Sequence, residues 1–89
     1  MDKEALEKIL NASDGFAELG LYDDAWEALQ EIPAEELDQI EVILRRVRIL
    51  VAIESWELAL VAATSLGDAH GMAEVTKICI ERLAGRKSD

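Results

Sequence analysis

The stretch Leu19-Gly20-Leu21-Tyr22-Asp23-Asp24-Ala25 decides the fold of this chain. Its glycine lies between two segments of helix-forming residues, so the stretch predicts the end of one helix, a tight turn and the start of another. It returns 34 places later as Ile53-Glu54-Ser55-Trp56-Glu57-Leu58-Ala59, with an aromatic residue on an aromatic one and Ala25 on Ala59. A repeat of this length predicts stacked helical hairpins.

The 34-residue match extends well beyond the turn. Each copy predicts a long helix, a tight turn and a shorter helix, although Glu54 stands where the first copy has Gly20. The match pairs apolar residues along both helices: Leu6 with Ile40, Ile9 with Ile43, Leu10 with Leu44, Phe16 with Leu50, Ala17 with Val51, and Ile32 with Leu66.

Apolar residues spaced by three and four positions predict five helices, over about 3–19, 22–32, 39–53, 56–65 and 69–84. Asp2 and Ser55 are predicted N-caps, and Asp38 with Glu41 has the spacing of a capping box. Pro33 ends the second helix, because proline disfavours a helical conformation in the residue before it. The third helix is apolar on most sides, which predicts that it is the central element.

The length and pattern of the copies resemble the tetratricopeptide repeat. Gly20 resembles the turn glycine of that family, Ala25 and Ala59 its packed alanine, and Tyr22 and Trp56 the aromatic residue that begins its second helix. The tryptophan that the family has early in its first helix is an isoleucine in both copies, at 9 and 43. The resemblance covers residues 3–66. It implies an all-α fold in which antiparallel hairpins stack as a short right-handed superhelix of five helices.

The chain of 89 residues is expected to form one domain, residues 1–89. The first repeat covers 3–33, the second 38–66, and a final helix over 68–85 is predicted to cap the stack. Asp68 is the predicted start of that helix and Gly85 its predicted end.

Acidic residues dominate the first half of the chain. The formal net charge is -10; residues 1–41 carry thirteen acids and two lysines, and residues 42–89 carry six acids and seven bases. This balance excludes nucleic acid and anionic membrane surfaces as expected partners, because like charges repel. The acids are interpreted either as solvated surface or as a site for a basic partner. A single cysteine, no secretory signal and no long apolar run predict a cytoplasmic protein.

The family resemblance implies a groove, lined by the first helix of each hairpin, that holds a peptide or a helix. The groove positions are Leu10, Asn11, Asp14 and Ala17 in the first copy, and Leu44, Arg45, Arg48 and Val51 in the second. Because Asp14 and Arg48 are 34 residues apart, we predict that they pair across the groove and leave Arg45 free to bind a carboxylate. The alternative is that Arg45, Arg46 and Arg48 balance nearby acids and bind nothing.

The sequence predicts no catalytic, cofactor or metal site. His70 and Cys79 lie nine positions apart on one predicted helix, about two and a half turns, so they cannot meet there. No glycine-rich phosphate loop is present. Trp26 has two interpretations, a packed residue between hairpins or an exposed anchor for a partner.

The predicted function is therefore a non-catalytic protein–protein interaction module, a scaffold or adaptor that binds a peptide or helix in the groove lined by the first, third and fifth helices. Two alternatives remain. The apolar edge of the first or last helix could join two copies as a homodimer, or the acidic half could mask a basic partner.

Overall fold

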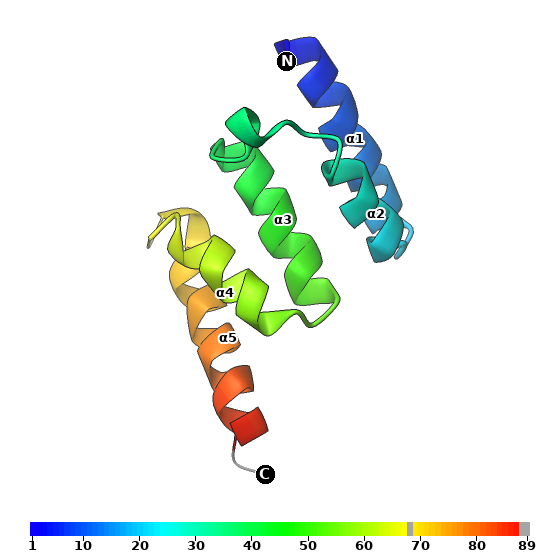
Figure 1. Cartoon of the computed structure of the whole chain (residues 1–89). Coiled ribbons are helices and arrows are strands. Elements are labelled where there is room, and N and C mark those ends of the chain that lie inside the picture. The colour runs from blue at the N-terminus through cyan, green and yellow to red at the C-terminus, as the bar shows by residue number, and fades with distance from the viewer. Residues whose placement is uncertain (68, 88–89) are drawn as a thin grey trace.

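The computed structural model describes the chain at residues 1–67 and 69–87, and this part is all-α with no strand (Figure 1). Asp68, the predicted cap of the last helix, lies outside the described residues. The five predicted helices are confirmed, with these bounds: α1 Lys3–Glu18, α2 Tyr22–Leu29, α3 Ile40–Ala52, α4 Trp56–Thr64 and α5 Met72–Lys87. Two short 3₁₀ turns join them: η1 Ala34–Glu36 and η2 Ala69–Gly71.

The turn between α1 and α2 is a Schellman motif, in which a left-handed residue lets two backbone N–H groups reach back to the helix. Leu21 N donates to Phe16 O at 2.9 Å, and Gly20 N donates to Ala17 O at 3.0 Å. Gly20 has φ 77°, as predicted for the residue after a helix end. At the other end of α1, Ala5 N donates to Asp2 Oδ1 at 2.7 Å, so the predicted N-cap is also present.

The turn between α3 and α4 repeats this geometry without a glycine. Ser55 N donates to Leu50 O at 2.8 Å, and Glu54 N donates to Val51 O at 3.1 Å. These are the bonds of the first turn shifted by 34 residues. Glu54 adopts φ 62°, a left-handed conformation that costs a non-glycine residue about 1–2 kcal/mol. The repeat seen in the sequence is therefore present in the backbone.

Several predicted helix boundaries are wrong. The Asp38 and Glu41 capping box does not form: Gln39 N donates to Glu36 O at 3.2 Å, which continues the η1 turn, and α3 begins at Ile40. Gln39, its N-cap residue, makes no side-chain cap bond, and neither does Ser55 at the start of α4. The helix therefore starts one residue later than a box requires.

The second and fifth helices also differ from the prediction at their ends. α2 ends at Leu29, and tighter bonds, such as Ile32 N to Leu29 O at 3.1 Å, carry the chain on to Pro33. α5 begins only at Met72, because His70 has φ 56° and the glycine after it φ 75°. α5 then passes Gly85, which does not end it, and runs to Lys87.

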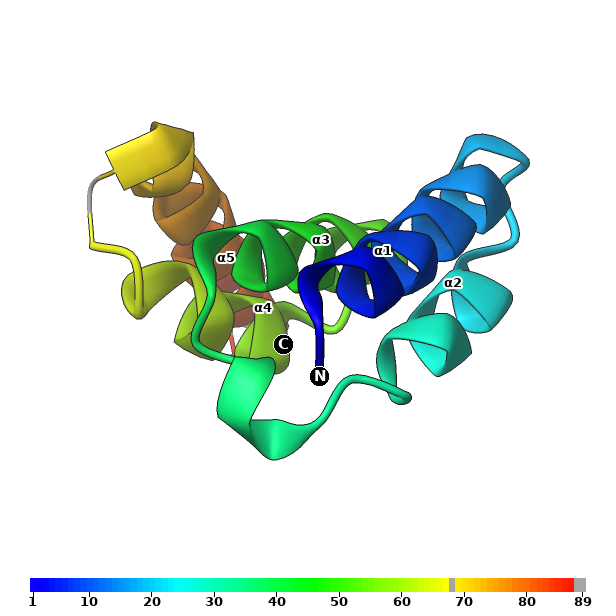
Figure 2. The same ribbon diagram turned by 90° about the horizontal axis from the view of Figure 1, so that it is seen from above.

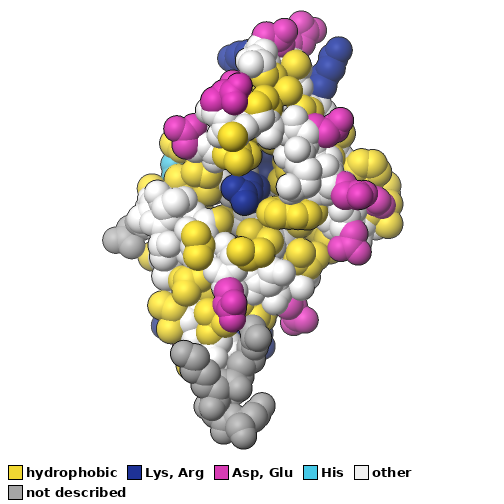
Figure 3. Space-filling model, in the orientation of Figure 1, with side chains coloured by type: hydrophobic (Ala, Val, Ile, Leu, Met, Phe, Trp, Pro, Cys, Tyr) yellow, Lys and Arg dark blue, Asp and Glu magenta, His cyan; other side chains and the backbone are white. Residues whose placement is uncertain are grey.

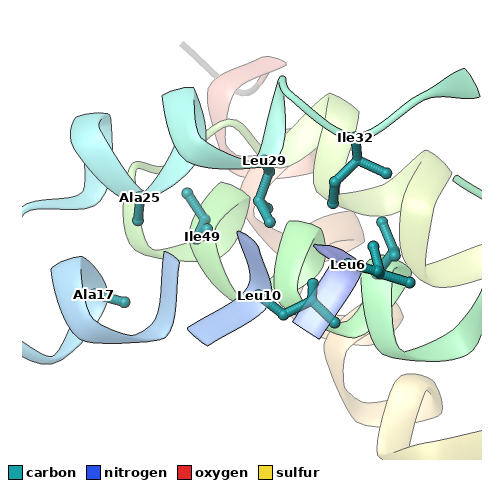
Figure 4. Packing of buried hydrophobic residues seen from close by; sticks show 8 residues of the cluster. Leu6, Leu10, Ala17, Ala25, Leu29, Ile32 and Ile49 are labelled. Atoms are coloured by element: carbon teal, nitrogen blue, oxygen red, sulfur yellow. The ribbon is translucent and has the colours of Figure 1, made fainter. Parts of the chain in front are cut away.

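α3 is the central helix, as predicted. One side of it, with Val42 and Ile49, completes a cluster formed mainly by the first hairpin (Figure 4). Its other side, with Ile43, Val47 and Leu50, packs in two clusters with residues of α4 and α5. Seen from above, α1 and α5 lie on opposite sides of α3 (Figure 2). The first cluster consists of Leu6, Leu10, Ala17, Ala25, Leu29, Ile32, Val42 and Ile49.

Small residues set the close approach of the helices. Ala25 and Ala59, the alanines paired by the repeat, are both 0% exposed, and so is Ala63 on α4. Cys79 of α5 is also completely buried, whereas its neighbour Ile78 is exposed. α5 packs principally on α4, so it extends the array beyond the second hairpin.

Candidate partner-binding surfaces

The predicted groove residues lie on α1 and α3, but they are not all accessible. Leu10 and Ala17 are buried in the first cluster, so they contribute to the core more than to a surface. Asn11 and Arg48 are exposed. Asp14 and Arg45 are half-buried and meet between the two helices. Leu44 and Val51 are also half-buried, but they pack against the cluster that α3 shares with α4 and α5.

Asp14 of α1 lies between two arginines of α3. Arg45 Nη2 donates to Asp14 Oδ2 at 3.1 Å, and Arg45 Nη1 donates to Glu41 O at 3.1 Å. Arg48 Nη1 lies farther from the same carboxylate, 3.9 Å from Asp14 Oδ1. The predicted pairing of Asp14 with Arg48 is confirmed as a long ion pair. The prediction that Arg45 stays free is wrong, because Arg45 makes the closer bond to the same carboxylate.

The burial of the two arginines explains this exchange of roles. They are one helical turn apart on α3, and the side chain of Arg45 is 28% exposed against 52% for Arg48. Arg45 thus lies deeper in the seam with α1 and reaches Asp14 directly. Arg48 makes no hydrogen bond to a described residue, so its donors face solvent beside a carboxylate that is already shared.

A shallow hollow of about 290 Å³ follows the seam toward the N-terminal ends of α1 and α3. Its described lining residues come from these two helices, and none of the described side chains of α5 is among them. The charges along the surface change sign: two acids lie near the helix N-termini and two arginines lie farther along. The lining is Glu7, Leu10, Asn11, Glu41 and Arg45.

The comparisons with known proteins returned no match: no family model, no curated protein and no solved structure matches this chain. The function of the surface is therefore inferred from its geometry.

A second hollow, of about 390 Å³, lies on the face of α3 opposite the Asp14 seam. Arg46 and Arg48 are two residues apart, about 200° around the helix, so they point to opposite faces. The space-filling view shows basic atoms set among hydrophobic and white, uncharged atoms near the middle of this face (Figure 3). We call this hollow the Arg46 hollow; its lining is Ala34, Leu37, Asp38, Ile43, Arg46, Leu58, Val61, Ala62 and Ser65.

The sequence carried a signal for the Arg46 hollow that the repeat pattern obscured. α4 is apolar around most of its circumference, with Leu58 and Val61 on the side away from its buried alanines. A helix apolar on all sides is either enclosed or leaves an apolar face uncovered. The two 34-residue copies match at their buried positions. This match contains no information on the outer side of α4.

Trp26 is a half-buried residue between the hairpins, which confirms the first of its two interpretations. It packs against the first cluster and also against the cluster of Leu50, Ala59 and Cys79. The guanidinium of Arg46 lies 5.5 Å from the centre of the Trp26 ring, a cation–π contact. Trp26 therefore contacts Arg46, one of the residues that line the Arg46 hollow.

The other reactive side chains considered from the sequence are a cysteine and a histidine. Cys79 is completely buried, and its burial raises the pKa of the thiol above the ordinary value. His70 is exposed in the η2 turn. Within residues 1–67 and 69–87, no three histidine, cysteine or acidic side chains lie close enough to hold a metal ion. Over the same residues, no helix combines the length and apolar character needed to cross a bilayer.

Proposed function

We propose that this chain is a non-catalytic protein-interaction module, a scaffold or adaptor built from divergent tetratricopeptide-like repeats with a right-handed stack, that acts in the cytoplasm. Its partner is a peptide or helical segment that lies along the α1–α3 seam and presents a carboxylate to Arg48. The single observation that supports this is the arrangement of Asp14, Arg45 and Arg48. Two guanidinium groups share one carboxylate, and the more exposed one keeps donors free for a second.

The charges along the seam favour one direction for such a segment. Glu7 and Glu41 border the hollow at the N-terminal ends of α1 and α3, and Arg48 lies beyond the other end. A segment with a basic residue at one end and an acidic residue at the other fits this order. Complementary charges of this kind fix the register of a bound chain and exclude wrong partners.

A second candidate function, the masking of a basic partner, is supported by the outer face of the first hairpin. There Phe16, 38% exposed, lies in a hollow of about 340 Å³ bordered by Asp24, Glu27 and Glu31. None of these three acids has an ion pair with a described residue. Binding at this face would be strongly weakened by salt and would not need Arg48.

A random-peptide display library selected on the wild-type protein tests the main proposal. We expect the enriched peptides to carry an acidic residue, and their synthetic forms to bind the wild type in fluorescence polarisation. Arg48→Glu should weaken this binding tenfold or more, because it places a carboxylate against the peptide's carboxylate, and like charges in contact at an interface cost on the order of several kcal/mol.

The matched control is Arg82→Glu, which makes the same charge change at an exposed position on α5. It should bind like the wild type. Equal binding by wild type and Arg48→Glu contradicts the proposal. Enrichment of basic peptides that still bind Arg48→Glu, and that dissociate in moderate salt, supports the masking function instead.

A further inference from the structure

The outer side of α4 exposes two large apolar residues. Leu58 is 57% exposed and Val61 is 68% exposed, and their spacing of three puts them on one face of the helix. The opposite side of α4 already packs Ala59 and Ala63 against α3 and α5. The exposed pair is therefore not needed to hold α4 in the fold.

These two residues border the Arg46 hollow. Leu37 of the link after η1, Ile43 of α3 and Ala62 of α4 complete its apolar wall. Its volume of about 390 Å³ is within the range of binding pockets in proteins. A contiguous exposed apolar patch with a polar rim marks an interaction site more often than a plain surface.

The hollow carries one charge of each sign, and the two charges do not meet within the chain. Arg46 is half-buried and stacks on Trp26, but no described carboxylate lies within ion-pair distance of its guanidinium. Asp38, on the same hollow, likewise has no cationic partner among the described residues. The patch thus presents an unpaired cation and an unpaired anion among the apolar residues that line the hollow.

We propose that a second copy of this chain covers the Arg46 hollow and forms a two-fold symmetric dimer. In a two-fold interface the same patch meets itself, so Arg46 of each copy faces the partner's Asp38 and the pair forms twice. Leu58 and Val61 of the two copies pack together between these pairs. A partner of one charge sign would leave one of the two groups unpaired, whereas an identical patch satisfies both.

This interface is independent of the α1–α3 seam. Arg46 and Arg48 point to opposite sides of α3, so a dimer through the Arg46 hollow leaves the proposed peptide surface of both copies open. It also differs from the homodimer expected from the sequence, which used the edge of the first or last helix. Dimerisation would present two seams to one partner, which raises the effective concentration of the second binding event.

Sedimentation velocity of the purified protein tests the proposal. The wild type should sediment with twice the mass of one 9.8 kDa chain at concentrations of about 100 µM. Arg46→Glu and Asp38→Lys should each be monomeric, because each homodimer would then hold two like-charged contacts. An equimolar mixture of the two variants should dimerise again, since the new glutamate of one variant faces the new lysine of the other and the native pair forms once.

Two further variants keep the test decisive. Val61→Glu changes a residue that is mostly exposed, so it should keep the wild-type helical content in circular dichroism while abolishing the dimer. Arg48→Glu, on the other side of α3, should remain dimeric. A monomeric wild type at about 100 µM, a Val61→Glu variant that stays dimeric, or a folded mixture that does not restore the dimer overturns the proposal.

Discussion

Hairpin α1–α2 and hairpin α3–α4 make the same turn with different residues. The turn residue is Gly20 in one and Glu54 in the other, and both adopt a left-handed conformation with equivalent hydrogen bonds. The alanine after each turn, Ala25 or Ala59, is completely buried. The hairpin therefore requires a left-handed backbone at the turn and a buried alanine after it. The left-handed residue itself need not be glycine.

The two hairpins differ more in what surrounds them. Phe16 and Leu50 are equivalent by the repeat, yet Phe16 is 38% exposed and Leu50 is 1% exposed. Leu50 shares a cluster with residues of α4 and α5, and Trp26 of α2 packs against the same cluster. Phe16 lies beside α2 on the outer face of the first hairpin. Equivalent positions in a repeat therefore have equivalent backbone but unequal burial.

The largest expected difference in stability is between variants of Leu50 and Phe16. Leu50→Ala should lower the free energy of unfolding by about 2–5 kcal/mol, because it removes buried methyl groups and leaves a cavity among three helices. Phe16→Ala should cost about 1 kcal/mol or less, since much of that ring is already in water. Urea unfolding followed by circular dichroism measures both.

Similar losses for the two variants would contradict the difference in burial. A large loss for Phe16→Ala alone would mean that the outer face of the first hairpin is covered in solution. In that case the Phe16 variant should also change the sedimenting mass, which distinguishes a covering molecule from an effect within the chain.

A smaller effect is expected at the second point where the hairpins differ. Ser13 of α1 is buried and donates from Oγ to Ala25 O of α2 at 3.0 Å, while its equivalent in α3 is the apolar Val47. Ser13→Ala should lower the free energy of unfolding by about 0.5–1.5 kcal/mol, the usual net value of one hydrogen bond. The same urea experiment measures it.

Ser65→Ala is the matched control for this prediction. Ser65 makes the same kind of bond, from Oγ to Ala62 O, but it is exposed and links residues of one helix end. It should change stability by less than about 0.5 kcal/mol in either direction. Equal effects at 13 and 65 would show that burial of the Ser13 bond contributes nothing.

Local chemistry allowed the sequence to predict most of the fold. The positions of Asp2, Gly20 and the paired alanines depend on backbone groups within a few residues, and their roles are confirmed. The apolar character of α3 depends on helical period alone, and its central place followed from it. The capping box at Asp38 is predicted from the same local patterns, and it is wrong. The η1 turn extends to Gln39, whose backbone N–H bonds to Glu36 O, so the helix does not begin after Asp38.

The candidate surfaces could be predicted only in part, because they depend on side chains from separate elements. The repeat put Asp14 beside α3 correctly, but the 34-residue offset selects Arg48, whereas Arg45, one turn earlier, makes the closer bond. Their relative depth in the seam decides the pairing. The Arg46 hollow requires the link after η1 to lie near α4, and periodicity contains no information on that approach.

The smallest expected changes in stability are at the two turns, and they have opposite signs. Gly20→Ala should lower the free energy of unfolding by about 0.5–1 kcal/mol: the left-handed conformation costs an L-residue about 1–2 kcal/mol, and the stiffer unfolded chain returns part of it. An added Cβ at Gly20 would meet no atom within 4 Å, so the cost is conformational only. Glu54→Gly should raise stability by the same amount, for the same reason with the opposite sign.

Measuring both changes, singly and together, shows whether the turns are equivalent. If they are, the double variant Gly20→Ala with Glu54→Gly should have nearly wild-type stability, because the sites lie in separate turns and their effects add. A Glu54→Gly variant that loses stability would mean that the Glu54 side chain contributes a contact larger than the strain of its backbone. In that case the Glu54 side chain would stabilise the second turn, and the two turns would not be energetically equivalent.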